Sequence, residues 1–401
     1  MPTRESKTGY FIIEGLNSFS TVYYTYYVYF FMEQKFGFGN KANLALAALI
    51  GLWYAIMAWG GGKFSQRYGY FTALKAGFVI MAVAVAIGSQ LGTATSQILS
   101  ILGMVVGMCL TWPTLEALVA ENETVAGLQR MVGIYNVVWA TTGSVAYFTG
   151  GWMLEKLGLQ SMFYVPVAFF LVQLAVTFWQ EAHAKKATST HANAVSAPSA
   201  HQGPPATATE PTAPHSPERR RMFVRLAWLA NPLGYIAINT LIAVMPGLAN
   251  RLGLSTAQAG FCASVWCFAR LGSFAFLWLW PGWHYRFRWL LTAYITMIIT
   301  FALVIMAPNV AILVLAQVIL GIVLGLLYYS SLFYSMDSSD TKGEHGGIHE
   351  AAIGLGNFAG PAVGAASLHF LPQHPNSGAI AVCTLLVLGL VGLLSIWRPN
   401  R

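Results

Sequence analysis

Four ionisable residues lie inside long apolar stretches of this 401-residue sequence, where an unpaired charge is costly. Arg270 is close to the middle of its stretch, and Glu14, Glu116 and Glu350 belong to three others. A guanidinium group keeps its proton in a protein, so Arg270 requires a carboxylate, an anionic ligand or a water-filled cavity. A carboxyl group can load and release a proton, which makes each glutamate a candidate for proton coupling.

Each of these residues also has a structural alternative. Arg270 can belong to an ion pair inside its own helix bundle instead of a binding site. Glu14 begins a polar and aromatic stripe at helical spacing, but it can also reach the membrane interface as a surface residue. The stripe continues through Asn17 or Ser18, Thr21, Tyr24 or Thr25, and Tyr27 or Val28. Glu116 follows Trp112 by one turn on the same helix face, and its alternative is likewise an interfacial position.

The densest ionisable cluster is the segment 337–350, which contains His345, His349 and Glu350. His349 and Glu350 at the inner end of one apolar stretch can form a proton-responsive gate, because histidine titrates near physiological pH. An ordinary capping role is the alternative. Two histidines four apart can also share a metal on a helix, although the glycines around His345 disfavour a helix there. We predict no metal site.

The composition is that of a membrane protein. Hydrophobic residues make up 56% of the chain and charged residues only 9%, against about 25% charged in soluble domains. A membrane-spanning helix needs about 20 apolar residues. Twelve runs meet this need: 10–33, 42–62, 71–91, 97–120, 128–150, 160–181, 223–249, 257–279, 288–307, 310–336, 348–371 and 377–397.

The basic residues predict the orientation. With the N-terminus inside, seventeen Lys and Arg residues fall in cytoplasmic segments and four in outer ones. The net charge of +8 therefore reflects topology, and we expect no nucleic-acid partner. The predicted location is the cell (inner) membrane, with multiple spans and both termini in the cytoplasm. The four cysteines lie in apolar runs, so we expect them to be small core residues that form no disulfides.

The chain is internally duplicated. Ile101–Gly107 and Ile319–Gly325 match at five of seven positions, and duplication in a membrane protein is typical of transport. The segment 182–222 is rich in Ala, Pro, Thr, Ser and His and is expected to be a disordered cytoplasmic linker. It divides the chain into an N-terminal six-helix bundle (1–181) and a C-terminal six-helix bundle (223–401). The histidines within it suggest metal binding as a minor alternative to a plain linker.

Three short motifs resemble those of the major facilitator superfamily. The loop Gly62–Gly69 is similar to the superfamily loop signature G-x-L-x-D-R-x-G-R-R, with Gln66 in place of the Asp and Arg67 retained. The segment 356–364 matches G-x-x-x-G-P-x-x-G and contains Gly360 and Pro361. A copy at 143–151 lacks the proline. The basic R-x-x-x-G motif linked to proton coupling is absent, because Gly103 stands four residues before Gly107.

This resemblance implies an all-α integral membrane fold with 12 transmembrane helices in two bundles related by a pseudo-two-fold axis. Gln66, Arg67, Gly360 and Pro361 are the expected gating residues, since a loop latch and a helix bend serve a bundle that must move. Glu14, Glu116, His349 and Glu350 are the expected proton-coupling residues. The substrate pocket is expected to contain Asn17, Tyr24, Trp112, Asn239, Trp266, Arg270 and Tyr328.

The function expected from these features is secondary active transport of a small organic solute by alternating access, coupled to protons as symport or antiport. The solute is neutral, amphiphilic or singly anionic. No GxxxxGK[ST] motif is present, which disfavours ATP-driven pumping. The alternatives are a transition-metal transporter that uses the His/Glu cluster, or a non-transporting membrane sensor or enzyme. We expect no catalytic residues and no cofactor, and a monomer in the lipid bilayer, because one chain already holds both halves of a cavity.

Overall fold

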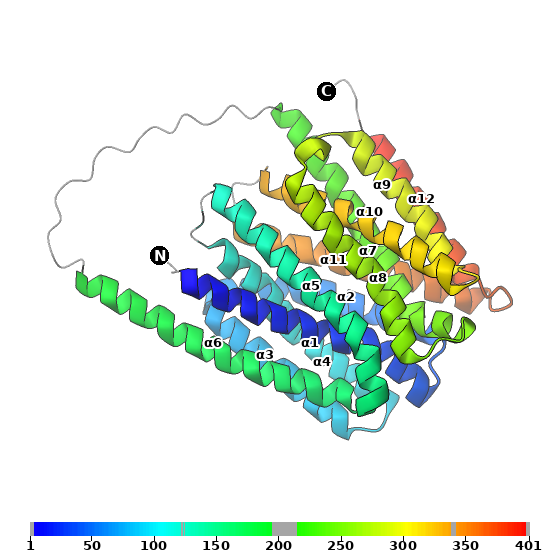
Figure 1. Cartoon of the computed structure of the whole chain (residues 1–401), viewed down its shortest axis with the longest axis horizontal. Helices are drawn as coiled ribbons and strands as arrows, with labels where there is room; N and C mark the ends of the chain where they lie inside the picture. The colour runs from blue at the N-terminus through cyan, green and yellow to red at the C-terminus, as the bar shows by residue number, and fades with distance from the viewer. Residues whose placement is uncertain (1–3, 122, 124, 195–214, 338–341, 398–401) are drawn as a thin grey trace.

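The computed structural model describes residues 4–121, 123, 125–194, 215–337 and 342–397, which form a bundle of long helices (Figure 1). The first half contains α1 (Arg4–Phe36), α2 (Asn40–Tyr68), α3 (Tyr70–Gln90), α4 (Ala94–Ala120), α5 (Val125–Leu157) and α6 (Ser161–Ala194). The second half contains α7 (Pro217–Arg251), α8 (Thr256–Leu279), α9 (Phe287–Ile305), α10 (Val310–Asp337), α11 (Lys342–Phe370) and α12 (Ser377–Ile396). A single 3₁₀ turn, Pro281–Trp283, lies between α8 and α9.

Successive helices run in opposite directions, so each connection lies at one of two ends of the bundle. We call the end where α1 begins and α12 ends the terminal end, which lies towards the upper left of Figure 1. The other is the opposite end. The α2–α3 and α8–α9 connections lie at the terminal end, as do the ends of α4, α6 and α10 and the starts of α5, α7 and α11.

Local chemistry defines several of the helix ends. Thr93 begins α4 with a capping box, in which its hydroxyl accepts a hydrogen bond from the Ser96 backbone N–H. Ser255 begins α8 in the same way with Gln258. Between α2 and α3 the chain reverses at one residue, Gly69, whose φ of +88° suits glycine and few other residues.

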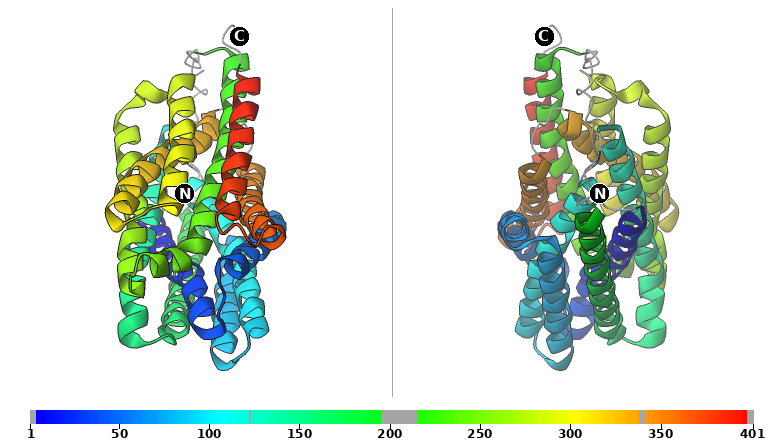
Figure 2. Two further views of the ribbon diagram at one scale, coloured as in Figure 1. Left: turned by 90° about the vertical axis from the view of Figure 1, so that its right-hand side faces the viewer. Right: turned by 90° about the vertical axis from the view of Figure 1, so that its left-hand side faces the viewer.

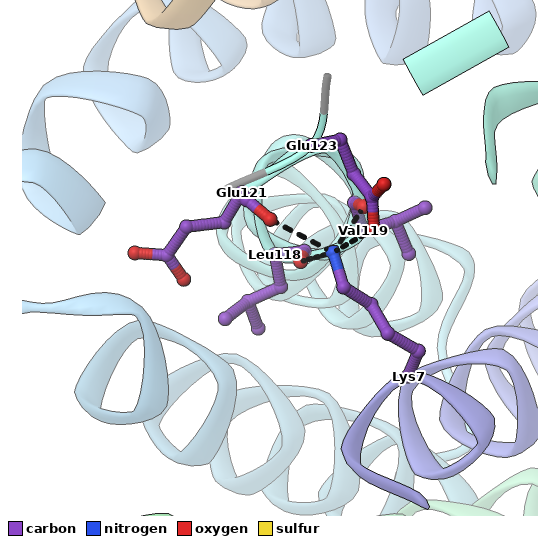
Figure 3. A network of polar contacts seen from close by, with 5 residues as sticks. All are labelled: Lys7, Leu118, Val119, Glu121 and Glu123. Atoms are coloured by element: carbon purple, nitrogen blue, oxygen red, sulfur yellow. Dashed lines mark hydrogen bonds and ion pairs between the residues drawn. The ribbon is translucent and has the colours of Figure 1, made fainter. Parts of the chain in front are cut away.

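A lysine joins the start of α1 to the end of α4. The Lys7 ammonium donates hydrogen bonds to the carbonyl oxygens of Val119 (2.7 Å), Glu121 (2.9 Å) and Leu118 (3.4 Å), and lies 3.2 Å from the Glu123 carboxylate (Figure 3). These carbonyls belong to the last turn of α4 and the residue after it, where helical carbonyls have no partner within the helix. Lys7 therefore fixes the geometry of the first half at the terminal end.

The helices pack as two groups that meet along a central seam (Figure 2). Within the first half, α3 packs on α4 and α6, and α1 packs on α5 and α6. Within the second half, α10 packs on α7, α8 and α9, and α7 packs on α11. Across the seam the most extensive contacts are those of α2 with α11 and of α5 with α8.

Glycines allow the α2–α11 pair to approach closely. A Cβ atom on Gly354 of α11 would lie 2.6 Å from the Ala55 backbone of α2, and one on Gly51 would meet the Asn357 backbone of α11. Small residues at such positions are typical of helix pairs that pack backbone to backbone in membranes.

The expected twelve helices are present, but only ten of the described helices are long and apolar enough to count as membrane spans by composition; α1 and α5 are not among them. The reason for α1 is visible in its packing. Its polar residues Asn17, Ser18 and Thr21 are fully buried against other helices. A helix enclosed by protein does not need an apolar surface for lipid, and its sequence is less hydrophobic accordingly.

The predicted linker 182–222 is too long at both ends. Helix α6 continues to Ala194, thirteen residues beyond the predicted end of the first bundle, and α7 already begins at Pro217. The continuation of α6 is polar and includes a Glu181–Lys185 ion pair one turn apart. At α7, the Ser216 hydroxyl caps the helix and Pro217 occupies its first turn. Capping and pairing thus support helix where composition alone suggests disorder.

Candidate functional site

A cavity of about 180 Å³ lies at the seam between the two halves. Helices α1, α2, α4 and α5 line it from the first half, and α7, α8, α10 and α11 from the second. Its walls are largely aromatic, with a few polar groups, which is the usual character of a small-molecule site. Seven of the predicted site residues line it: Trp112, Glu116, Asn239, Trp266, Arg270, Tyr328 and Glu350.

The Arg270 guanidinium lies over two tryptophan rings. Its guanidinium carbon lies 4.7 Å from the ring centroid of Trp266, one turn earlier on α8, and 4.5 Å from that of Trp139 on α5. The side chain is buried, and its Nε atom has no hydrogen-bond partner. The predicted alternative, an ion pair inside the second half, is not found: no carboxylate among the described residues pairs with Arg270.

Glu14 and Glu350 are buried and Glu116 is half-buried, and the three lie near one another at the terminal side of Arg270. Glu350 accepts a hydrogen bond of 2.5 Å from the hydroxyl of Tyr54 on α2, so this contact joins the two halves. Glu116 interacts electrostatically with Glu350 and with Glu14. Within the described part of the chain none of the three is paired with a cation. The alternative of an interfacial position is wrong for Glu14, which is fully buried.

Further polar and aromatic contacts cross the cavity. The Asn239 side chain on α7 donates a hydrogen bond to the Asn357 side-chain oxygen on α11. Trp139 stacks on Tyr328 of α10 with ring centroids 5.7 Å apart and an angle of 16° between the planes. The indole N–H of Trp112 is buried without a partner, and its ring packs against Tyr54. The wall therefore combines flat apolar surfaces with hydrogen-bonding groups that a ligand can reach.

Two predicted pocket residues, Asn17 and Tyr24, do not line the cavity. The Tyr24 hydroxyl lies 3.3 Å from the Ser100 hydroxyl of α4, and the Asn17 amide donates weakly to Thr111 on the same helix at 3.5 Å. The face of α1 that does line the cavity carries Val22, Thr25, Tyr26 and Tyr29. This face is displaced by one residue from the predicted stripe, or about 100° around the helix.

Glu14 belongs to the same buried side of α1 and contacts the cavity only through its neighbours. The Ser18 hydroxyl donates to one carboxylate oxygen at 2.7 Å, and the other oxygen has no hydrogen-bond partner. Tyr135 of α5, which lines the cavity, interacts electrostatically with both Glu14 and Glu116. Glu14 is therefore placed behind the cavity wall.

The predicted gating residues occupy two different settings. Gln66 and Arg67 are exposed at the end of α2, and the Arg67 guanidinium lies over the neighbouring Tyr68 ring at 5.4 Å. Neither side chain hydrogen-bonds to another helix within the described ranges, so the expected latch is not formed in this conformation. Pro361 lies inside a continuous α11. Gly360 packs closely on Ile236 and Thr240 of α7.

The side chains of His345 and His349 lie outside the described residues, as do His191 and His201 of the predicted linker. His183 is exposed, and its ring nitrogen is 2.9 Å from the Trp179 carbonyl oxygen. Among the residues that the structure does describe, no three His, Cys, Asp or Glu side chains are close enough to hold a metal ion.

The halves are tied together at the opposite end. The Gln34 amide donates to the Thr256 hydroxyl (3.0 Å), and the Asn250 amide donates to Glu33 (3.0 Å). The Ala257 backbone N–H at the start of α8 donates to the Glu155 carboxylate of α5 (2.7 Å). These contacts join α1 to α7 and α8, and α5 to α8, so the protein closes this side of the cavity.

The sequence model of the Major Facilitator Superfamily matches residues 10–361. The chain belongs to the major facilitator superfamily. It is therefore a multi-pass membrane protein and a secondary transporter, not an enzyme. No curated protein is similar enough in sequence to match it.

Solved structures of this fold superpose on nearly the whole chain. The crystal structure of a mutant of the nucleoside transporter NupG has a TM-score of 0.67 at 12% identity and covers 98% of this chain and 100% of that one. That of a mutant of the peptide transporter POT has a TM-score of 0.67 at 15% identity, with 98% and 94% covered. That of the D-xylose-proton symporter has a TM-score of 0.68 at 15% identity, with 98% and 96% covered. At such low identity the similarity concerns the fold.

Sequence reasoning missed several residues of the cavity. Trp139, Tyr235, Tyr54, Tyr135 and Asn357 all line it. A usable signal existed on α5, because Tyr135 and Trp139 are one turn apart and therefore share a face. For Tyr54 and Tyr235 no such signal exists, since a tyrosine in an apolar run is equally typical of a membrane interface.

Proposed function

We propose that this transporter moves a small organic solute through the central cavity by alternating access, with protons as the coupling ion. The observation that carries the proposal is the position of Glu350. Its carboxylate lines the cavity, belongs to the second half, and accepts a hydrogen bond from Tyr54 of the first half. A proton bound at this carboxyl group acts at the same time on the cavity and on the seam.

The chemistry of this contact supports coupling. A hydrogen bond to an ionised carboxylate is stronger than one to a neutral acceptor. Protonation of Glu350 therefore weakens its bond to Tyr54 and loosens α2 from α11, whereas deprotonation restores it. Glu116 and Glu14, which interact electrostatically with Glu350 or with each other, extend this site to α4 and α1.

Alternating access requires one side of the cavity to close while the other opens. The three hydrogen bonds at the opposite end correspond to a conformation closed on that side. If the basic residues mark the cytoplasmic side as expected, this conformation faces the cytoplasm. An inner-membrane location, cytoplasmic termini, a division into two six-helix bundles between α6 and α7, and a monomeric state are further parts of this proposal.

Proteoliposomes test the coupling directly. Purified protein is reconstituted with a pH-sensitive dye inside the vesicles, and a panel of solutes is added with and without an imposed pH gradient. We expect at least one solute whose uptake follows the gradient and moves protons with it. If the pH gradient changes the uptake of no solute in the panel, transport is not coupled to protons.

Glu350→Gln isolates the proposed coupling group, because Gln keeps the size of the side chain and cannot ionise. We expect this variant to bind solute but to lose the gradient-driven component of uptake. Glu181→Gln is the matched control: this glutamate pairs with Lys75 and Lys185 near the protein surface, away from the cavity. Equal loss in both variants would show a general effect on folding or insertion instead of coupling.

A further inference from the structure

Arg270 is a permanent cation buried at the centre of the protein without a partner carboxylate among the described residues. An arginine in a membrane-spanning helix is costly unless another group balances its charge. The two ionisable carboxyl groups that line the cavity, those of Glu116 and Glu350, form no ion pair with it. Arg270 lines the cavity, so an anionic group bound there can balance its charge.

Two tryptophans contact the guanidinium group of Arg270. The guanidinium carbon lies over the rings of Trp266 and Trp139, 4.7 and 4.5 Å from their centroids, so both are cation–π contacts. The N–H donors of a guanidinium point outward in its own plane. This edge matches a carboxylate, which can accept two parallel hydrogen bonds from it.

The cavity separates this cation from the acidic residues. Tyr235 and Tyr328 each interact electrostatically with Arg270 as well as with Glu116 and Glu350. The two tyrosines thus share their environment with both charged groups, while no direct contact joins the groups themselves. A ligand can place an anionic group at Arg270 and rest its apolar part on the aromatic wall without displacing an internal ion pair.

We propose that the solute is a small organic anion whose carboxylate pairs with the edge of Arg270 beside Trp139 and Trp266. This proposal rests on the transport function proposed above, because it names the solute that is transported. Binding of the anion at Arg270 does not depend on proton coupling. The cavity volume of about 180 Å³ limits the solute to a small body. Trp139, from the other half of the protein, is a positioning residue for Arg270.

Matched probes in detergent solution test the class of ligand. Each set contains a carboxylate, its primary amide and its amine on the same body, and the bodies are short aliphatic, hydroxylated and aromatic. Thermal stabilisation of the purified protein is measured for every member. We expect at least one carboxylate to stabilise the protein, with its amide and amine having no effect. A panel in which no carboxylate stabilises the protein, or in which amides or amines do so equally, overturns the proposal.

Arginine variants test the site. Arg270→Gln is expected to weaken binding of the responding carboxylate at least about 100-fold, and Arg270→Lys about 10-fold, since lysine keeps the charge but loses the planar fork. The matched control is Arg251→Gln. The Arg251 guanidinium donates to the Ile305 and Ala307 carbonyls at the opposite end, away from the cavity. Unchanged binding in Arg270→Lys would overturn the edge geometry even if Arg270→Gln fails to fold.

Binding and coupling fail separately in these experiments. If a carboxylate binds through Arg270 but its uptake ignores the pH gradient, the proposed proton coupling is wrong and the anion site stands. If a neutral solute is taken up with protons and Arg270→Gln retains that uptake, the coupling stands and the anion site is wrong.

Discussion

The Tyr54 hydroxyl on α2 and the Glu350 carboxylate on α11 form a hydrogen bond across the seam between the two halves. Both residues line the central cavity, and both are buried. The same two helices approach closely through Gly51 and Gly354. The contact therefore combines a titratable group, a ligand cavity and the most extensive helix pair of the seam in one place.

Replacing Tyr54 by Phe removes this bond and keeps the ring. We expect a loss of about 1–3 kcal/mol from the contact between α2 and α11, seen as faster exchange of solute and weaker dependence of uptake on the pH gradient. Tyr294→Phe is the matched control, because its hydroxyl donates to the Leu386 carbonyl inside the second half at 2.9 Å. It should lower the melting temperature similarly and leave the pH dependence of uptake intact.

Replacing Lys7 by Met should destabilise the first half. The change removes the donor that serves three carbonyls at the end of α4 and leaves the buried ones without a partner, which costs about 2 kcal/mol or more. Thermal unfolding of the purified protein measures it. Lys75→Met removes a half-buried ion pair with Glu181 and should cost about 1 kcal/mol or less. Equal shifts for the two variants would contradict the capping role of Lys7 (Figure 3).

Gly354→Ala should force α11 away from α2. The new methyl group would lie 2.6 Å from the Ala55 backbone, and overpacking of this kind costs about 1–3 kcal/mol. Because the strain exists only when the halves are close, we expect faster labelling of a cavity cysteine at Thr25 from the terminal end, in a background without the four native cysteines. Gly60→Ala has no heavy atom within 4 Å of its new methyl group and serves as the control. Similar labelling in both variants would argue against the close packing.

Glu155→Gln should loosen the opposite end. The carboxylate accepts from the first turn of α8, where the N-terminal end of the helix dipole favours negative charge by about 0.3–1 kcal/mol. Labelling of the same Thr25 cysteine from the opposite side should rise about two- to five-fold. Glu123→Gln, at the terminal end, changes no contact between the halves and should leave this rate unchanged. An unchanged rate in Glu155→Gln would exclude this pair as part of the closure.

The sequence predicts the cavity better than it predicts the neighbours of each residue. Arg270, Glu116 and Glu350 were identifiable because charge in an apolar run is costly, and all three line the cavity. Tyr24 was assigned to the wrong wall because α1 is polar on several faces, so its hydropathy does not reveal which face meets the cavity. A shift of one residue along α1 turns a side chain from α4 towards the cavity. The rotation of α1 about its axis is set by its packing against the other helices.

The partners of the charged residues come from distant parts of the sequence. Trp139 reaches Arg270 from 131 positions away, and Tyr54 reaches Glu350 across 296. Nothing in the local sequence around either charge indicates these pairs. The end of α6 also differs from the prediction, because the helix continues past residue 181 with a Glu181–Lys185 ion pair that composition does not reveal.

The position of Arg270 has an electrical consequence. Its charge is permanent, so the empty cavity differs by one elementary charge from a cavity that holds a monovalent anion. A membrane voltage acts on a charge that water reaches from one side only, at about 2.3 kcal/mol per elementary charge for each 100 mV. Voltage therefore biases the return of the empty carrier and the passage of the loaded one to different extents, and the resting potential becomes a determinant of how fast the protein turns over.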